Sequence, residues 1–235
     1  MTTYVLVHGA WHGPWAWERV TPLLHATGAR MLIPDLGASG DRGLHGDART
    51  IAAALDSVPE DEKLVLVGHS YAGLVVREAA DLRPAAVDHL VLVDGWAGPD
   101  GASLFALAPD AFVTAIRAAA ASGDGWRIPP PPPAAFGVTD TDDAAWLADH
   151  LVPQALRTFT EATRLTGAVD RVPGTAIHCR LAAYPFDRFA AALGYRTLPL
   201  DGPHDVMLTD PERLVRLLLD GRGRPMRFEN RKFEV

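Results

Sequence analysis

One stretch of the sequence decides the fold: Val67-Gly68-His69-Ser70-Tyr71-Ala72-Gly73. It joins an apolar run to a segment with helical periodicity, and a serine in such a sharp turn must take a strained backbone that projects its hydroxyl above the sheet. The small residues Gly68, Ala72 and Gly73 let strand and helix approach closely. The usual G-x-S-x-G pattern has glycine at the position of Ala72, which is still small. We therefore predict that Ser70 is a nucleophile rather than an ordinary helix N-cap.

Short apolar runs alternate with helical segments on both sides of this stretch, which is typical of a parallel sheet covered by helices. We predict six strands, at residues 4–8, 30–34, 63–68, 88–94, 175–180 and 195–200. We predict helices at residues 14–25, 47–55, 71–82 and 211–219, the last of which has a Thr209/Asp210 cap and a stop at Gly221. The predicted class is α/β, with a mostly parallel sheet of about six strands and helices on both faces.

The alternation breaks once, between Trp96 and about Pro173. That stretch contains helical pieces at 109–122 and 142–165 around five consecutive prolines, 129–133, which form a stiff polyproline II spacer. An insert of this length between two strands is more often functional than idle. We therefore predict a core of residues 1–95 and 173–220, a cap or lid of residues 96–172 inserted before the fifth strand, and a solvated tail of residues 221–235.

Composition excludes several classes of protein. The 235 residues are 48% hydrophobic and include 22 basic and 29 acidic residues, a formal net charge of −7, so we do not expect a nucleic-acid partner. The single cysteine, Cys179, forbids an internal disulfide and suits a reducing compartment. The sequence shows neither a signal-peptide pattern nor an apolar run long enough for a membrane helix. We expect a cytoplasmic protein without a membrane partner, either a monomer or a homodimer.

A second signal is the loop after the first predicted strand, which reads His8-Gly9-Ala10-Trp11-His12-Gly13. Acyl transfer needs two backbone N–H groups aimed at the developing oxyanion. We expect one from Ala10, in the glycine-flanked loop, and the other from Tyr71, which follows the nucleophile. The alternative is a plain turn with His8 and His12 as buried polar residues. For the two histidines we favour such structural hydrogen bonds, and for the loop as a whole we favour the oxyanion hole.

A third signal, Asp201-Gly202-Pro203-His204-Asp205, lies between the last predicted strand and the last predicted helix. Ligands of open α/β sheets bind at the carboxyl edge, and a histidine on a loop there can reach a nucleophile at the same edge. We therefore predict that His204 is the general base that takes the proton from Ser70 and returns it to the leaving group.

Taken together, the motifs LVHGAWHGPWAW, PDLGASG, GHSYAG and GPHDVMLTDP resemble those of the α/β-hydrolases. Within that superfamily the chain looks most like the small esterase and hydroxynitrile lyase group that includes plant methylesterases. The resemblance covers residues 1–95 and 173–220, whereas the cap matches only loosely. It implies a cofactor-free Ser-His-acid enzyme in which Ser70 is acylated and Ala10 and Tyr71 stabilise the oxyanion.

Two positions depart from the lyase members, which carry threonine after the first-strand histidine and lysine after the catalytic histidine. This chain has Gly9 and Asp205 there. A lyase must stabilise departing cyanide with positive charge, and an aspartate would work against that. Hydrolysis is therefore favoured over cyanohydrin cleavage.

The acid of the triad is the least determined part. Related sequences place it a few residues beyond Cys179, where this chain has alanine. A base without an orienting carboxylate loses tautomer control, at a cost of about 10⁴ in rate. Asp94, at the end of the fourth predicted strand, is one substitute, and Asp187, which would need the loop to fold back, is another. The third alternative is that no acid is present.

Other chemistry has little support. The nine histidines show no H-E-x-x-H spacing and no Walker or Rossmann glycine pattern follows a strand, so we expect no metal and no cofactor. Cys179 is expected to be a buried hydrophobe. Four tryptophans are candidate substrate contacts: Trp11, Trp96, Trp126 and Trp146.

The prediction is a serine hydrolase that cleaves a carboxylic ester of a small apolar substrate through an acyl-enzyme. A thioesterase or lactonase would use the same residues. One alternative is a non-hydrolytic cyclase, lyase or acyltransferase of a biosynthetic pathway, which could dispense with the acid. The other is a ligand-binding protein that kept the pocket, although the joint presence of Ser70, His204 and the glycine loop argues against it.

Overall fold

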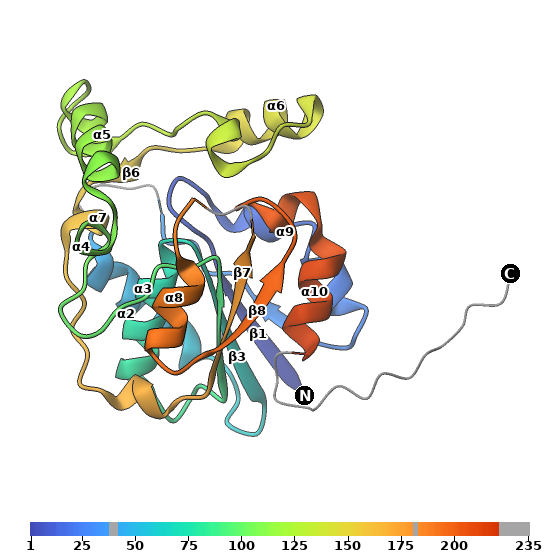
Figure 1. The fold of residues 1–235 in the computed structure, drawn as a ribbon. Coiled ribbons are helices and arrows are strands. Elements are labelled where there is room, and N and C mark those ends of the chain that lie inside the picture. The colour runs from blue at the N-terminus through green and yellow to red at the C-terminus, as the bar shows by residue number, and fades with distance from the viewer. Residues whose placement is uncertain (38–41, 181–182, 221–235) are drawn as a thin grey trace, which may run out of the picture.

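Six parallel strands form the central sheet of the computed structural model, which describes residues 1–37, 42–180 and 183–220 (Figure 1). The strand order is β2-β1-β3-β4-β7-β8. The strands are β1 Thr2–Val7, β2 Arg30–Leu32, β3 Lys63–His69, β4 His89–Val93, β7 Gly174–Cys179 and β8 Arg196–Leu200. The predicted parallel sheet is confirmed, and each of its strands lies within two residues of a predicted one at both ends. The predicted tail, 221–235, lies outside the described residues.

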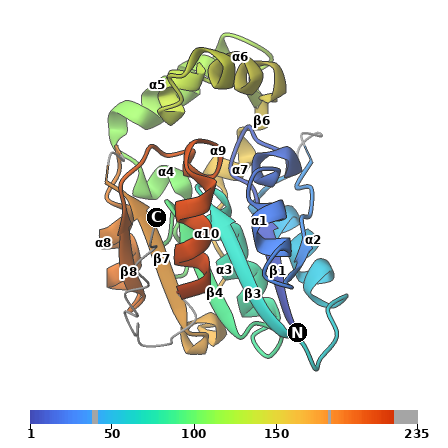
Figure 2. The ribbon, with the colours of Figure 1, turned by 90° about the vertical axis from the view of Figure 1, so that its right-hand side faces the viewer.

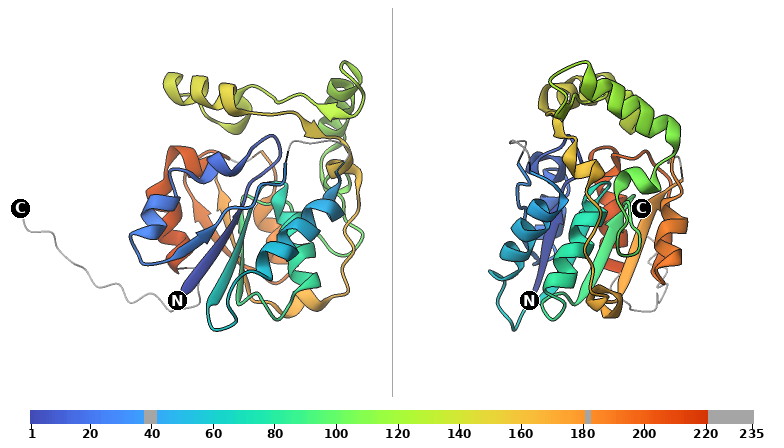
Figure 3. Two further views of the ribbon diagram at one scale, coloured as in Figure 1. Left: turned by 180° about the vertical axis from the view of Figure 1, so that it is seen from behind. Right: turned by 90° about the vertical axis from the view of Figure 1, so that its left-hand side faces the viewer.

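Helices cover both faces of the sheet (Figures 2 and 3). On one face lie α1 Thr21–His25 and α10 Pro211–Asp220, and on the other lie α2 Leu44–Leu55, α3 Ala72–Leu82 and α8 Phe186–Ala192. Two shorter elements also belong to the core, η1 Pro14–Trp17 and α9 Val206–Thr209, whereas η3 Ala168–Arg171 ends the insert that precedes β7 and contacts α3. The sheet is buried on both faces because its apolar runs are continuous, and Val65, Leu66 and Val67 of β3 are each at most 2% exposed.

Close packing of β3 on α3 depends on Gly68. A Cβ built on Gly68 would lie 2.7 Å from the Ala72 carbonyl oxygen and 2.7 Å from Cγ2 of Val76. Only glycine permits this approach, so the predicted role of a small residue in the turn before Ser70 is confirmed at this position.

The insert between β4 and β7 extends above the carboxyl edge of the sheet, where α5 and α6 are drawn over the strands (Figure 1). Its elements are α4 Leu104–Leu107, α5 Asp110–Ala121, β5 Arg127–Ile128, η2 Pro133–Phe136, α6 Thr141–His150, β6 Gln154–Ala155 and α7 Arg157–Thr160. β5 and β6 pair antiparallel as a separate two-stranded sheet. We propose residues 96–172 as the cap and use that name below.

Prolines explain the helices that differ from prediction. The helix predicted at 14–25 is split into η1 and α1, because Pro22 lies in the first turn of α1 and cannot donate a hydrogen bond to a preceding turn. The helix predicted at 142–165 ends at His150, before Pro153, and the chain continues through β6 and the short α7. The helices α4 and α8 and the pair β5–β6 were not predicted.

Candidate active site

Ser70 occupies the turn between β3 and α3 with a left-handed backbone, φ 53°. This conformation costs on the order of 1–3 kcal/mol for a residue with a Cβ. Hydrogen bonds hold the turn: the Ser70 N–H donates to the Val93 carbonyl (3.1 Å), and the Ser70 carbonyl accepts from the N–H groups of Gly73 and Trp96 (both 3.0 Å). The predicted strained turn is therefore present, and it places Ser70 in the wall of a pocket.

His204 lies on the loop between β8 and α9, with its ring beside Ser70. The Ser70 hydroxyl donates to Nε2 of His204 at 2.9 Å. Burial lowers the pKa of His204, but the hydrogen bond and charge of Asp94 raise it more, so that the pKa lies above its usual value of 6.5. A neutral imidazole in this position can take the serine proton, which is the arrangement that general-base catalysis requires.

The carboxylate that contacts His204 belongs to Asp94. This residue directly follows β4, has φ 46° and is fully buried. His204 Nδ1–H donates to Oδ2 of Asp94 at 2.6 Å, and the Cys179 N–H donates to Oδ1 at 2.8 Å. Asp187 lies in the first turn of α8, and no hydrogen bond or ion pair joins it to His204 within the described chain. Of the two candidate acids, the structure brings Asp94 to the histidine.

The loop His8–His12, called the β1 loop below, lies against the nucleophile. A Cβ on Gly9 would be 3.0 Å from Cβ of Ser70 and 2.9 Å from Nδ1 of His69, so only glycine fits here. Ala10 and Tyr71 are 3% and 1% exposed, and neither backbone N–H donates a hydrogen bond within the described part of the chain. Buried N–H groups are rarely left without an acceptor, and an oxyanion would supply one.

Two histidines hold the β1 loop, as the structural interpretation of them predicted. His8 Nδ1–H donates to the Gly9 carbonyl (2.9 Å), and its Nε2 accepts from the Leu36 N–H (3.2 Å). His12 Nδ1–H donates to the Ala10 carbonyl at 2.8 Å. The peptide unit is planar, so fixing the Gly9 carbonyl also fixes the direction of the Ala10 N–H.

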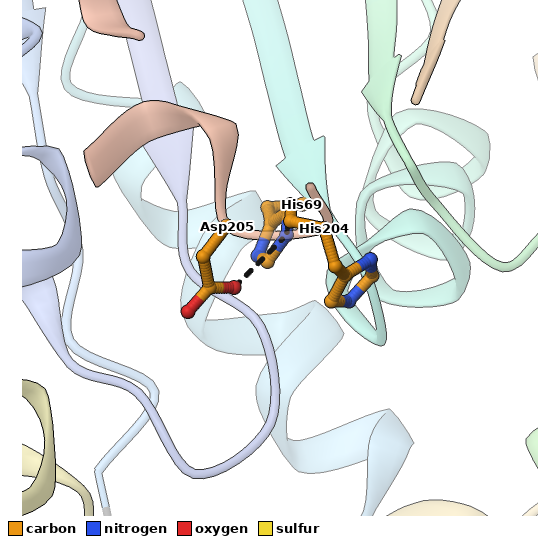
Figure 4. A group of neighbouring side chains, drawn as sticks. All are labelled: His69, His204 and Asp205. Atoms are coloured by element: carbon orange, nitrogen blue, oxygen red, sulfur yellow. Dashed lines mark hydrogen bonds and ion pairs between the residues drawn. The ribbon is translucent and has the colours of Figure 1, made fainter. Parts of the chain in front are cut away.

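A buried polar cluster next to the site was not predicted. Nε2 of His12 lies 2.9 Å from Oδ2 of Asp205, and His69 Nε2–H donates to the His204 carbonyl at 3.1 Å. Nε2 of His69 also lies 3.8 Å from Oδ1 of Asp205 (Figure 4). Burial raises the pKa of Asp205, but the facing His12, His69 and His204 rings lower it below its usual value, so Asp205 is ionised. Burial and the neighbouring His204 lower the pKa of His69 well below its usual value.

This cluster changes the interpretation of Asp205. Nδ1 of His12 lies against the Ala10 carbonyl and its Nε2 lies against the Asp205 carboxylate, so this carboxylate is committed to a buried contact within the protein. Asp205 was expected to work against the stabilisation of a departing anion. Its carboxylate is fully buried and is not among the described residues that line the pocket.

The pocket above Ser70 encloses about 470 Å³ between the core and the cap. Most of its wall is aromatic or aliphatic, contributed by Trp11, Trp96, Leu104, Phe112, Ile116, Phe136, Phe159, Tyr184 and Phe186. No lysine or arginine is among the described residues that line it. Most of these residues were not singled out from the sequence, because an apolar side chain in the cap gives no sign of which way it will face.

The four candidate tryptophans separate into two groups. Trp11 and Trp96 line the pocket. Trp126 is 75% exposed at a different depression of the cap, and Trp146 packs on Trp15, with ring centroids 5.3 Å apart. Neither Trp126 nor Trp146 lines the pocket above Ser70, so their contact with substrate stays a prediction.

Three side chains place ligand-type atoms within 4.8 Å of one another: His69, His204 and Asp205. Both ring nitrogens of His204 are already paired with Ser70 and Asp94, and Nε2 of His69 is bonded to the His204 carbonyl. The donor atoms are committed to hydrogen bonds within the protein, so we assign no metal to this group. Cys179 is buried, and burial together with Asp94 raises the pKa of its thiol.

Comparison with known proteins agrees with this geometry. Residues 4–217 match the alpha/beta hydrolase family. The chain belongs to that family. A carbendazim hydrolyzing esterase of Nocardioides sp. (strain SG-4G) is 31% identical over 244 residues, which cover 93% of this chain and 98% of the relative. Methylesterase 2 of Arabidopsis thaliana is 41% identical over 102 residues, 40% of this chain and 39% of the relative. The predicted superfamily and methylesterase-like group are confirmed.

The alpha/beta hydrolase fold is also found in a solved structure of an extracellular alpha/beta-hydrolase from a Paenibacillus species. It has a TM-score of 0.84 and 18% sequence identity, and covers 94% of this chain and 99% of its own. No helix in the described residues combines the length and apolar character needed to cross a membrane. The cytoplasmic location and the oligomeric state remain predictions.

Proposed function

We propose that the protein is a serine hydrolase that cleaves a carboxylic ester of a small, uncharged, apolar substrate through an acyl-enzyme. The observation that carries this proposal is the continuous chain of hydrogen bonds from Ser70 Oγ to His204 Nε2 and from His204 Nδ1 to Asp94, at 2.9 and 2.6 Å. A nucleophile, a base and an orienting acid in contact are the minimum set for acyl transfer by serine.

In acylation, Ser70 Oγ attacks the ester carbonyl carbon while His204 Nε2 accepts the serine proton. The carbonyl oxygen becomes an oxyanion, which the unpaired N–H groups of Ala10 and Tyr71 would stabilise. The imidazolium of His204, held by Asp94, then donates its proton to the alcohol oxygen as the C–O bond breaks. The acyl group remains on Ser70, and the alcohol leaves.

In deacylation the roles are repeated with water. His204 accepts a proton from a water molecule as its oxygen attacks the acyl carbon, and the same two N–H groups hold the second oxyanion. His204 then returns the proton to Ser70 Oγ as the acyl bond breaks, which releases the carboxylic acid and restores the free enzyme.

The pocket supports an apolar substrate. Among the described lining residues, five have a polar group in the side chain: Ser70, His204, Tyr184, Trp11 and Trp96. Of these, the two tryptophans contribute only an indole N–H. A charged substrate group would lose its hydration there without gaining a partner. Two relatives are named as an esterase and a methylesterase, and these names support the same reaction class. Thioesters and lactones could be cleaved by the same residues.

The test is covalent labelling of Ser70. Intact mass after exposure to a fluorophosphonate probe is measured alongside turnover of p-nitrophenyl butyrate, with Ser70→Ala as the control. We expect one adduct and turnover in the wild type, and loss of the adduct with a fall in kcat of at least about 10³ in the variant. An unlabelled wild-type protein would contradict the proposal and favour a ligand-binding protein.

An adduct without ester turnover would favour the non-hydrolytic alternative, such as a lyase or acyltransferase. That alternative was motivated by the alanine at the expected position of the acid, whereas Asp94 provides a carboxylate at His204. The described lining residues also include no cation for an anionic leaving group such as cyanide. We therefore keep hydrolysis as the proposal.

A further inference from the structure

Trp11, in the β1 loop, has a backbone that an L-residue rarely adopts. Its φ is 64°, in the left-handed region, and it follows Ala10, whose N–H we propose as an oxyanion donor. Such a conformation persists only where the surroundings hold it on several sides. The contacts of Trp11 therefore show what holds the β1 loop in its present shape.

The three hydrogen bonds that Trp11 makes with described residues all lead to the cap. Its N–H donates to Oε1 of Gln154 (3.1 Å), its carbonyl accepts from the Val152 N–H (2.9 Å), and its indole N–H donates to the Ile128 carbonyl (3.2 Å). Ile128 and Gln154 lie in the paired strands β5 and β6. The β1 loop, which belongs to the core, is thus hydrogen-bonded to the two-stranded sheet of the cap.

The peptide unit between Ala10 and Trp11 is held at both ends. On the core side His12 Nδ1–H donates to the Ala10 carbonyl, and His12 is paired with Asp205, the neighbour of His204. On the cap side Gln154 accepts from the N–H of the same unit. Because the unit is planar, these two bonds fix its rotation and with it the ψ angle of Ala10.

Gln154 is itself oriented. Its Nε2–H donates to Oγ1 of Thr158 at 2.9 Å, and the Thr158 hydroxyl donates to the Ala155 carbonyl at 2.7 Å. This chain of bonds points Oε1 toward Trp11. Within the described residues, Gln154 is the only cap side chain that hydrogen-bonds to the β1 loop, since the other two cap partners of Trp11 are backbone groups.

We propose that Gln154 is a positioning residue, which couples the docking of the cap to the geometry of the oxyanion hole by holding the Trp11 N–H. The inference rests on the proposed function for its catalytic consequence. Trp11 also lines the pocket, so the same residue of the β1 loop borders both the cap and the space above Ser70. A displacement of about 1 Å in such a site costs about 10²-fold in rate.

The experiment compares four variants with the wild type on p-nitrophenyl butyrate. Gln154→Met keeps the side-chain length but removes the acceptor, and Gln154→Glu keeps an acceptor. Thr158→Val releases the far end of the Gln154 amide without touching Trp11. Thr160→Val is the matched control, because it removes an exposed hydrogen bond in the same short helix, α7.

We expect Gln154→Met to lower kcat by about 10- to 100-fold with KM changed less than about twofold. A trifluoromethyl ketone, to whose carbonyl carbon Ser70 Oγ adds to form a hemiketal with an oxyanion in the site, should lose affinity by the same factor. Gln154→Glu should recover most of kcat, Thr158→Val should fall between the two, and Thr160→Val should match the wild type. A Gln154→Met enzyme with wild-type kcat, or one in which kcat and KM worsen together with Tm, would overturn the inference.

Hydrogen exchange supplies a readout that needs no substrate. In Gln154→Met the amide of Trp11 should exchange at least about tenfold faster than in the wild type, and in Thr160→Val it should not. Unchanged exchange at Trp11 contradicts the inference whatever the enzyme's activity. An unlabelled and inactive wild type would instead overturn the proposed function, so the two failures are distinguishable.

Discussion

Asp94 sets both the tautomer and the pKa of His204. In Asp94→Asn the amide oxygen can still accept from the Cys179 N–H, which leaves the amide NH₂ facing Nδ1 of His204. The ring proton is then forced onto Nε2, where it blocks acceptance of the Ser70 proton. We expect kcat for p-nitrophenyl butyrate to fall by about 10⁴ with the fold retained.

The pH profile provides a second measure of the same contact. His204 must be neutral to act as a base, and its pKa is raised above 6.5, so kcat/KM in the wild type should rise with pH along a limb above that value. Loss of the Asp94 charge should move the limb to lower pH. The control is Asp187→Asn, which should keep the wild-type rate and limb, and a large effect there would indicate that Asp187 is the acid.

At the scale of elements, helices α2 and α3 meet at a buried carboxyl group. Asp47 of α2 is 2% exposed and accepts a hydrogen bond from the Tyr71 hydroxyl at 2.8 Å. Burial raises its pKa from 3.8 to about 6, against the opposing effect of the Tyr71 hydrogen bond. As the pH rises, the Asp47 carboxyl therefore stays protonated to a higher pH in the folded chain than in the unfolded chain. Its contribution to the free energy of unfolding is full below about pH 4 and declines as the pH rises through about 6.

We therefore expect Asp47→Asn to remove a pH dependence of up to about 3 kcal/mol in the free energy of unfolding. The measurement is urea denaturation of the wild type and the variant at pH 4, 5, 7 and 8. Relative to the variant, the wild type should lose stability between pH 4 and 7. Asp61→Asn, at an exposed position, should track the wild type, and a constant difference between wild type and Asp47→Asn would show that Asp47 does not titrate in this range.

At the scale of the whole molecule, substrate size is set where core and cap meet. Phe112 of α5 lines the pocket and lies 5.6 Å from the Tyr184 ring, between centroids. Phe112→Ala should enlarge the pocket and raise the ratio of kcat/KM for p-nitrophenyl octanoate over butyrate by about tenfold or more. The control is Thr114→Ala, exposed on the same helix, which should leave the ratio unchanged. An unchanged ratio in Phe112→Ala would place the longer chain elsewhere.

The sequence by itself determined the parallel sheet, the turn at Ser70 and the loop that carries His204. These features follow from apolar periodicity and turn chemistry, which depend on residues only a few positions apart. The predicted helix bounds were wrong at Pro22 and Pro153, because a single proline interrupts a helix even where its neighbours have a helical pattern. The roles of Ala10 and Tyr71 as oxyanion donors, which the loop and the position after Ser70 indicate and the family resemblance also implies, remain proposals.

Only the tertiary structure decided which carboxylate meets His204 and which tryptophans meet the pocket. Asp94 and His204 are 110 positions apart and come together because β4, β7 and β8 are neighbours in the sheet, an order that no local pattern states. Asp205 likewise faces His12, 193 positions away, rather than the substrate. Contacts between distant segments depend on the order of the strands and on how the cap lies over the sheet. The residues next to a side chain in the sequence contain no information about either.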